Sequence, residues 1–556
     1  MDHPNHPRQD PVHFPTDRRL RIWVRPPVPA LTALAVAFPV AVAWAQYFLT
    51  GLPEVPHVPR LHPDSISDPQ GFPAWLRITH YVNFLFIALL IRSGLSILMD
   101  HPRLYWNAHC TPGTEWLRFT PLEVPKDRVW QAKDDARYIS PWLALPGYRH
   151  TIGVARHWHL LCALLWVASG LVYVGLLFAT NQWMRLVPTS WSILADAWAV
   201  FINYVTLHMP AEIEGFHSYN ALQQLSYFTV VFVMAPLSIL TGLAMSPAID
   251  NRFPWYPKIF GNRQAARSIH FLLLVGYVGF VVVHVATVVA TGLAHNMNSI
   301  VLGTKDQGAT GIVLGVIGIA AVLAACFFAH WLSWHYPRIL QRLIGRIHTF
   351  IGTLFFDHIT PRAQYSKEDI SPFLWPNGKM PTSAEWESMA ANDFKDFRLK
   401  ISGLVEHPVE LSLDEIKAMG KQEQITMHHC IQGWSGIAEW GGLPMTMLCD
   451  IVKPRPDAKV VVFRSFGDGL YGGEYYDTQP IENVLRAQCM LAYEMNYQPI
   501  DRLYGAPLRL RVENQLGYKM VKWIKAIEFV DSEKAVGEGY GGKNEDDEYF
   551  DLTPEI

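Results

Sequence analysis

Histidine is the residue type whose spacing in this sequence most clearly suggests redox chemistry. His270 and His284 lie fourteen residues apart within one apolar segment. In a helix this spacing places them about 21 Å apart along the axis and about 40° from a common azimuth. A single spanning helix would therefore offer an imidazole near each face of a membrane, which is the arrangement that two stacked b-type haems need.

Each haem iron needs a second imidazole from a facing helix, and three histidines are candidates. His80 stands at the start of an earlier apolar segment, and His157 and His159 stand at the start of the next one. Because successive spans run in opposite directions, we expect His80 beside His284, and His157 or His159 beside His270. His159 lies deeper in its segment and is preferred. Single histidines are common at the ends of spans, but ionisable groups at membrane depth are costly and usually functional.

A second candidate site lies in the C-terminal half, at a lone cysteine and a group of basic residues. Cys430 follows a short apolar and polar alternation and leads into a turn rich in glycine and tryptophan. Its thiolate would suit a metal that prefers soft ligands, although most lone cysteines are small buried hydrophobic residues. Arg509 and Arg511 share one face of a predicted strand, and Lys522 follows that strand. This face would cradle a phosphate or remain a solvated basic surface.

Composition argues against several other classes of protein. The six cysteines form no CxxC or CxxCH motif, so disulfides, structural zinc held by cysteine, iron–sulfur clusters and c-type haem are unsupported. The net charge of -3 argues against a nucleic-acid partner. Half of the 556 residues are hydrophobic, which predicts one region in lipid and one in water.

Six apolar segments are long enough to cross the roughly 30 Å hydrocarbon core of a membrane. They cover residues 30–50, 78–98, 159–180, 222–245, 269–292 and 311–332. A seventh run, Trp191–Leu207, is shorter and contains Asp196, so it is interpreted as an interfacial or re-entrant helix.

The basic residues that flank these segments predict their orientation. Alternate flanks carry twenty Lys and Arg residues on one side and four on the other. The positive-inside rule then places the N-terminus and, with six spans, the C-terminal half in the cytoplasm. We therefore expect a multi-pass protein of the inner membrane.

The predicted fold is an all-α transmembrane bundle followed by a soluble α+β domain. Alternating strands such as Phe397–Ile401, Lys459–Phe463 and Leu508–Val512 indicate the second part, and the acidic cluster Glu545–Glu548 is expected to be solvated. The predicted boundaries are a cytoplasmic tail at 1–29, a di-haem domain at 30–335, a linker at 336–372, a soluble domain at 373–550 and a tail at 551–556.

The membrane half resembles the b-type cytochrome subunits of formate dehydrogenases and Ni,Fe-hydrogenases. Four elements carry this resemblance over residues 75–305: Arg77-Ile-Thr-His80, His157-Trp-His159, Arg267-Ser-Ile-His270 and His284. The resemblance implies two b-type haems and exchange of electrons with membrane quinone or quinol. The extra span before His80 is a departure that would invert the core in the membrane.

The soluble half resembles the molybdopterin domain of the sulfite oxidase family. The ordered motifs are His428-His-Cys-Ile-Gln-Gly-Trp434, Trp440-Gly-Gly-Leu-Pro444, Leu491-Ala-Tyr-Glu-Met495, Tyr504-Gly-Ala-Pro-Leu-Arg509 and Val521-Lys-Trp523. The resemblance implies that Cys430 ligates molybdenum. It further implies that molybdopterin is bound by Arg509, Lys522, Ser465, Tyr504, Asn377 and Val521.

One departure from that family bears on the substrate. Sulfite oxidases carry an arginine shortly after the ligand cysteine, whereas residues 431–436 contain no cation, which puts sulfite in doubt. The pattern is closer to the bacterial methionine-sulfoxide-reductase catalytic subunit. The sequence therefore predicts quinol-driven oxygen-atom transfer from a small S- or N-oxide. The alternatives are a sulfite-type dehydrogenase that feeds quinone, and a haem conduit or redox sensor with an inactive molybdenum domain; the oligomeric state is undetermined.

Overall fold

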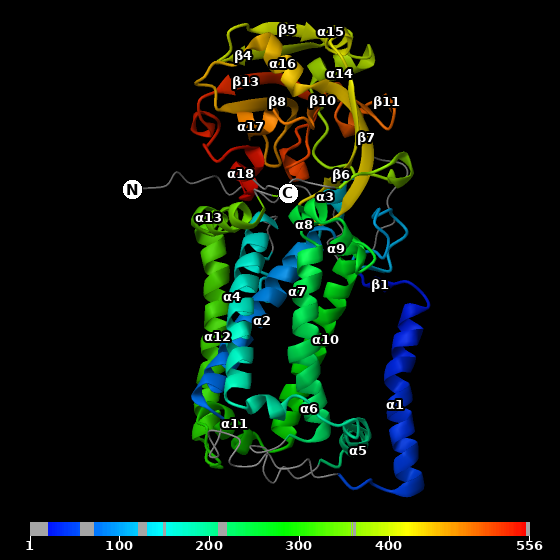
Figure 1. The fold of residues 1–556 in the computed structure, drawn as a ribbon, viewed down its shortest axis with the longest axis vertical. Coiled ribbons are helices and arrows are strands. Elements are labelled where there is room, and N and C mark those ends of the chain that lie inside the picture. The colour runs from blue at the N-terminus through cyan, green and yellow to red at the C-terminus, as the bar shows by residue number, and fades with distance from the viewer. Residues whose placement is uncertain are drawn as a thin grey trace.

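The chain forms a bundle of long helices with a β-rich domain at one end of it (Figure 1). The structure, a computed structural model, describes residues 20–55, 72–120, 131–147, 152–209, 219–356, 359, 363–551 and 556. The predicted fold class is confirmed. Residues 1–19 of the predicted N-terminal tail and residues 552–555 of the predicted C-terminal tail lie outside the described residues.

Six helices are long and apolar enough to cross a membrane, as the sequence predicts. The fourth of them contains a π-helical turn, η3, between two α-helical parts. The helices are α1 (Val28–Thr50), α2 (Ala74–Asp100), α4 (Ile152–Ala179), α6–η3–α7 (Ala221–Phe228, Thr229–Met234, Ala235–Ala244), α10 (Arg263–Ala290) and α12 (Thr310–His335).

The direction of the spans puts the start of α1, α4 and α10 at the end of the bundle that carries the soluble domain (Figure 1). Asn262 caps this end of α10, where its side-chain oxygen accepts hydrogen bonds from the first free backbone amides of the helix. Helix α1 stands apart from the other spans (Figure 1) and contacts α5 through Trp198, which donates a 3.0 Å hydrogen bond to Gln46.

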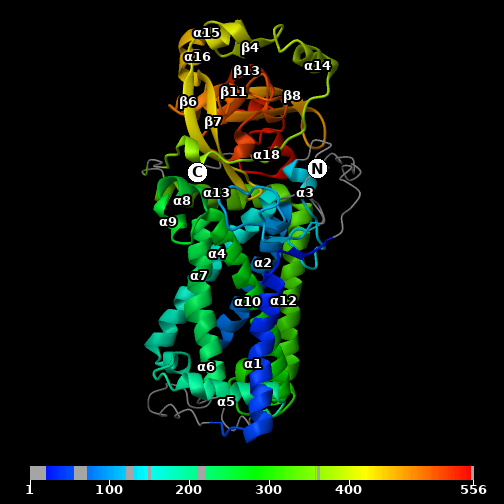
Figure 2. The same cartoon turned by 90° about the vertical axis from the view of Figure 1, so that its right-hand side faces the viewer.

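Short helices lie at both ends of the bundle (Figures 1 and 2). At the end far from the soluble domain lie α5 (Ile193–Val205), which is the predicted interfacial helix, η2 (Gln182–Arg185) and α11 (Leu293–Val301). At the near end lie α3 (Ala132–Asp135), α8 (Pro247–Arg252), α9 (Trp255–Lys258) and α13 (Pro337–Phe356). Helix α13 occupies much of the segment that the sequence predicted to be a linker.

A small three-stranded sheet in the order β1-β3-β2 lies between the two halves. Its strands are β1 (Trp23–Val24), β2 (Arg103–Leu104) and β3 (Leu117–Arg118). The buried guanidinium of Arg103 pairs with Asp135 at 2.6 Å and with Glu115 at 2.8 Å. This network fixes the loop after α2 beneath the soluble domain.

The soluble domain contains two five-stranded sheets. One sheet has the strand order β5-β4-β13-β8-β9. The other has the order β11-β10-β7-β6, and β12 also pairs with β10. The strands are β4 (Arg398–Gly403), β5 (Val409–Ser412), β6 (Gln422–His429), β7 (Ser435–Pro444), β8 (Val460–Asp468), β9 (Glu474–Pro480), β10 (Cys489–Met495), β11 (Gln498–Pro499), β12 (Arg509–Val512) and β13 (Ile524–Val530).

Large buried aromatic residues fill the core of this domain, among them Trp375, Trp434, Trp440, Phe397 and Phe463. Short helical segments connect the strands. They are η4 (Lys367–Asp369), α14 (Ala384–Ala391), α15 (Leu413–Ala418), α16 (Met445–Val452), α17 (Ile481–Val484), η5 (Arg502–Tyr504), η6 (Gly517–Lys519), η7 (Glu533–Ala535) and α18 (Lys543–Glu548).

The prediction that the acidic cluster at 545–548 is solvated is wrong. Glu545, Asp546 and Glu548 are buried in α18. The ammonium of Lys519, itself 1% exposed, lies between Glu545 and Asp477 and forms an ion pair with each carboxylate. Carboxylates remain inside a protein when a buried cation pairs with them, and the sequence pattern did not reveal the position of Lys519.

Candidate functional site: two histidine pairs and a cysteine loop

The four histidines that the sequence singled out form two pairs between helices. The ring centroids of His80 on α2 and His284 on α10 lie 6.4 Å apart, and those of His159 on α4 and His270 on α10 lie 6.3 Å apart. An imidazole nitrogen binds a metal at about 2 Å, so two rings on opposite sides of one iron have centroids about 6 Å apart. Each pair therefore has the spacing that one haem iron requires.

Hydroxyl groups orient three of these rings. The Nδ1 atoms of His159 and His270 lie 3.1 Å from the Ser93 hydroxyl and 3.0 Å from the Thr241 hydroxyl. The Nδ1 atom of His284 lies 3.4 Å from the Tyr227 hydroxyl. A hydrogen bond at Nδ1 leaves Nε2 as the metal-binding atom.

The sequence did not single out these hydroxyl residues. In the sequence each is only a polar residue within an apolar span. Ser and Thr residues in spans often bond to the backbone of their own helix, so this pattern alone does not indicate a contact with histidine.

Of the two candidates at the start of α4, His159 faces His270. His157 instead points toward the C-terminal segment, where its Nε2 lies 2.6 Å from Asp551. The pair formed by His159 and His270 lies in the part of the bundle near the soluble domain, because α4 and α10 both begin there. The pair formed by His80 and His284 lies toward the opposite end.

Cys430 lies at the end of β6, in a tight turn that leads into β7. The turn is closed by hydrogen bonds from the Cys430 amide to the Trp434 carbonyl, 3.1 Å, and from the Gly433 amide to the Cys430 carbonyl, 3.0 Å. Gly433 has a φ of +100°, which favours glycine. Burial raises the pKa of the Cys430 thiol to about 12, so a metal that binds this sulfur must displace a proton.

The predicted molybdopterin residues gather beside this turn. A Cβ atom added to Gly505 would lie 3.1 Å from Cβ of Arg509 and 3.2 Å from Cβ of Lys522, so this glycine separates the two cations. Gly378 lies against Lys522. Its neighbour Asn377 donates a 3.2 Å hydrogen bond to Gln432, whose same oxygen lies 3.7 Å from the Cys430 sulfur.

Arg509 and Lys522 form a cationic cradle beside the Cys430 turn. The remaining three predicted residues form hydrogen bonds that involve backbone groups in or next to this cradle. The Ser465 hydroxyl donates a 2.7 Å hydrogen bond to the Lys522 carbonyl. Tyr504 donates from its hydroxyl to Leu374 and accepts at its carbonyl from Arg509. The Val521 carbonyl accepts from the amide of Leu510.

Arg509 and Lys522 make the cradle positively charged. Burial, with the adjacent Arg511, lowers the pKa of Arg509 to about 9, and burial with Arg509 lowers the pKa of Lys522 well below its usual range. Within the described part of the chain neither cation forms an ion pair, and Nε of Arg509 has no hydrogen-bond partner. Buried cations are stable when an anion compensates them, so the site fits the phosphate of a molybdopterin.

The loop that carries Cys430 rests directly on the membrane half. The Gly433 carbonyl accepts hydrogen bonds of 3.1 Å from both Arg263 and Gln264 on α10. The Ile431 carbonyl accepts a 3.4 Å hydrogen bond from Arg156 on α4. Gln432 donates to the carbonyl of Asp100 at the end of α2.

The sequence did not place cations at this junction, because the segment next to Cys430, residues 431–436, contains none. A Cβ atom added to Gly433 would lie 3.5 Å from the Arg267 guanidinium, and Arg156 and Arg263 contact the same loop. Their signal was present in the Arg-x-x-His spacing at Arg267. It was interpreted only as part of a haem motif.

Family models match both halves of the chain. A model described as prokaryotic cytochrome b561 matches residues 71–303, and one described as an oxidoreductase molybdopterin binding domain matches residues 387–536. The chain joins a cytochrome b561 domain to a molybdopterin-binding oxidoreductase domain. The resemblances drawn from the sequence are thereby confirmed, and six apolar helices accompany a domain that matches an oxidoreductase family model.

Relatives resemble parts of the chain. A putative protein-methionine-sulfoxide reductase subunit YedZ1 from Azospira oryzae is 36% identical over 135 residues, which are 24% of this chain and 49% of that protein. The protein-methionine-sulfoxide reductase catalytic subunit MsrP from Xanthomonas campestris is 31% identical over 156 residues, which are 26% of this chain and 48% of that protein. The chain thus spans about half the length of these curated relatives.

A solved structure also aligns with part of the chain. The sulfane dehydrogenase SoxCD from Paracoccus pantotrophus covers 25% of this chain and 39% of its own, at 22% identity and a TM-score of 0.23. A score this low does not bear on the fold.

Lys522→Met tests the cradle, because it removes one uncompensated buried cation and keeps the length of the side chain. We expect pterin content per haem to fall. The cofactor-free protein should unfold at a higher temperature, with a gain of roughly 1 kcal/mol or more. The measurements are fluorescence of the oxidised pterin and thermal unfolding of protein from a host that makes no cofactor. Lys525→Met, at a more exposed lysine paired with Glu474, is the control; equal pterin content in both variants would contradict the assignment.

Proposed function

We propose that this protein passes electrons between the membrane quinone pool and a molybdenum centre through two b-type haems, and that it reduces a small S- or N-oxide. The observation that carries this proposal is the contact between the Cys430 loop and the two helices that hold the near histidine pair. Arg156 and Arg267 each stand three residues before His159 and His270, which is about 4.5 Å along a helix. The loop with the candidate metal ligand therefore lies close to one candidate haem.

The proposed reaction balances with two electrons. The oxide R₂S=O takes two electrons and two protons, the S=O bond breaks, and R₂S and water form. Quinol supplies the two electrons, which pass singly through the haems. Molybdenum, when bound, supplies the two-electron oxygen-atom chemistry. The chain supplies the Cys430 thiolate, the cations of the cradle, and a loop that is buried between the two halves.

Two observations bear on the substrate. The matched relatives are named as sulfoxide reductase subunits, which supports an oxide. The burial of the Cys430 loop against α4 and α10 supports a small molecule rather than a folded protein, because a protein surface would need open access to the loop.

A second candidate function is oxidation of an anion such as sulfite, with electrons passing to quinone. Arg156, Arg263 and Arg267 favour it, because they place three cations at a loop that the sequence alone left without any. Charge-assisted hydrogen bonds from such cations offset the desolvation of an oxyanion.

Cys430→Ser tests the metal site and separates the two candidate functions. We expect reoxidation of reduced haems by a neutral sulfoxide to slow by more than roughly 100-fold, because a charge-donating ligand is lost, while pterin content stays unchanged. The control is Cys449→Ser, at a cysteine that is equally buried, 5% exposed in both cases.

Stopped-flow measurement of the haem bands follows both directions of electron transfer. Rapid reduction of oxidised haems by sulfite in the wild-type protein would make the sulfite candidate the better one. Full activity in the Cys430→Ser variant, or a wild-type protein that contains no molybdenum, would contradict both candidate functions.

Histidine variants test the two haems. His284→Ala should lose the haem farther from the soluble domain and His270→Ala the nearer one, each leaving one haem per chain, because a low-spin bis-histidine haem needs both imidazoles. Haem content by pyridine haemochrome and the spectrum of the remaining haem provide the measurement. His157→Ala should keep both haems. Retention of two haems by His159→Ala and loss of one by His157→Ala would reverse the assignment on α4.

We further propose that the soluble domain and the start of α1 lie in the cytoplasm of a cell with an inner membrane. The excess of basic residues at the domain end of the spans supports this orientation. Alkaline phosphatase fused after Ile556 should be inactive, and a control fusion after Gly51, at the opposite end of α1, should be active. Strong activity of the C-terminal fusion would invert the orientation.

A further inference from the structure

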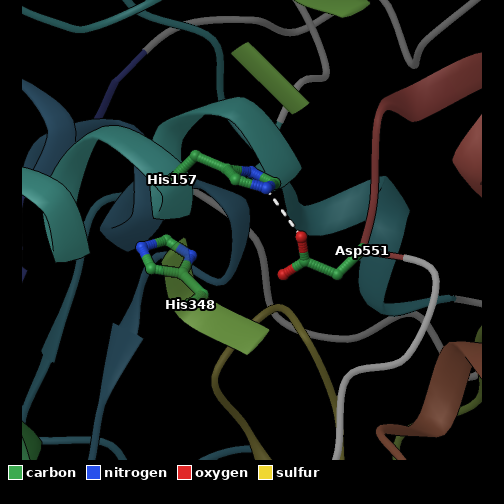
Figure 3. Close-up of side chains that lie close together, drawn as sticks. All are labelled: His157, His348 and Asp551. Atoms are coloured by element: carbon green, nitrogen blue, oxygen red, sulfur yellow. Dashed lines mark ion pairs between the residues drawn. The ribbon is translucent and has the colours of Figure 1, made fainter. Parts of the chain in front are cut away.

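Two histidines and a carboxylate converge where three distant segments of the chain meet (Figure 3). His157 comes from α4, His348 from α13 and Asp551 from the segment after α18. One ligand atom from each residue lies within 4.8 Å of the other two. This cluster belongs neither to the cradle around Cys430 nor to the pair formed by His159 and His270.

His157 is held in the orientation of a metal ligand. Its Nδ1 lies 2.6 Å from the Gly153 carbonyl, to which it donates, and its Nε2 faces Asp551 at 2.6 Å. Metal-binding histidines usually donate their second ring N–H to a carbonyl or carboxylate, which fixes the tautomer and the direction of the ring. The side chain of His157 is 2% exposed, so this orientation is fixed by packing.

His348 is the residue that a simple ion pair between His157 and Asp551 leaves unexplained. Both of its ring nitrogens are buried, and neither has a hydrogen-bond partner in the described part of the chain. Its ring stacks on that of His157 with 5.5 Å between centroids. A buried polar group without a partner is destabilising, and a metal ion bound to His348 would give one of its nitrogens a partner.

Without a metal, the 2.6 Å contact between Nε2 of His157 and the Asp551 carboxylate is an ion pair that holds a proton. Zinc would displace that proton, as metals do when they bind protonated ligands.

We propose that His157, His348 and Asp551 bind one Zn²⁺ ion, with water as the fourth ligand. Two imidazoles and one carboxylate are a common zinc ligand set. Zinc ligands at about 2 Å from the metal lie about 3.3 Å from one another in a tetrahedral site. The present cluster reaches this spacing through small side-chain movements. The ion would tie the C-terminal segment of the soluble domain to α4, two residues before His159.

The test uses the full chain in detergent with both domains intact. Protein stripped by a chelator is dialysed against graded concentrations of free Zn²⁺, and bound zinc per chain is measured by mass spectrometry. We expect about one zinc per chain. X-ray absorption at the zinc edge should show nitrogen and oxygen ligands that include two imidazoles. This edge is separate from those of iron and molybdenum. Wild-type protein that binds no zinc, or zinc without imidazole ligands, would overturn the proposal.

Variants assign the ligands. His348→Ala and Asp551→Asn should each weaken zinc binding by roughly tenfold or more, with haem spectra unchanged. His335→Ala, at an exposed histidine on the same side of the bundle, should bind zinc like the wild type. In His348→Cys a sulfur ligand should appear at about 2.3 Å from the zinc. Unchanged zinc affinity in His348→Ala protein with intact haem spectra would also overturn the proposal.

Discussion

The contact between the Cys430 loop and the first turns of α4 and α10 is the interaction on which the rest of this structure depends. Backbone carbonyls of the loop accept hydrogen bonds from Arg156 and Arg263, and each helix presents a paired histidine within two turns of that contact. Both helices must therefore begin at the same face, which an even number of alternating spans provides. Helix α1 then places the N-terminal side of the chain at that face as well. The small sheet around Arg103 fills the space between the spans and the domain, so the loop meets a rigid surface.

This junction concentrates positive charge in a buried place. Arg156, Arg263 and Arg267 lie under the Cys430 loop, and Arg509 and Lys522 lie on its other side. The first group is partly compensated by backbone carbonyls, which are dipoles and not full charges. Arg511 differs from both groups because Glu513 pairs with it at 2.7 Å. The contrast shows that this fold can supply carboxylates to buried cations where it needs them. Among the described residues no carboxylate forms an ion pair with Arg509 or Lys522, and an anionic group that binds there best explains this difference.

Local periodicity was sufficient to predict the spans and the partners of the histidines. A spacing of fourteen residues on one helix and the alternation of direction predict His80 beside His284, and His157 or His159 beside His270. The structure brings His80 to His284 and His159 to His270. The Arg-x-x-His spacing marked Arg267 in the sequence, but it did not place any cation under Cys430. These cations come from helices more than 160 residues away, and their position depends on how the two domains dock. The prediction for Glu545 was wrong for the same reason. A run of acidic residues is expected to be solvated unless the position of a buried cation such as Lys519 is known.

The length of α10 explains how one helix can carry two of the paired histidines. A single haem near the soluble domain would leave the rest of a hydrocarbon layer about 30 Å thick between it and the opposite face. The fourteen residues between His270 and His284 span about 21 Å of that thickness. The facing histidines come from helices of opposite direction, so His80 pairs near the start of α2 and His159 near the start of α4. The hydroxyl groups of Ser93, Thr241 and Tyr227 lie beside three of the paired rings. Moving either histidine by two residues would rotate it by about 200° and turn it away from its partner. The spacing on α10 is thus fixed by membrane thickness and helix periodicity together, and the position of the soluble domain decides which pair is the near one.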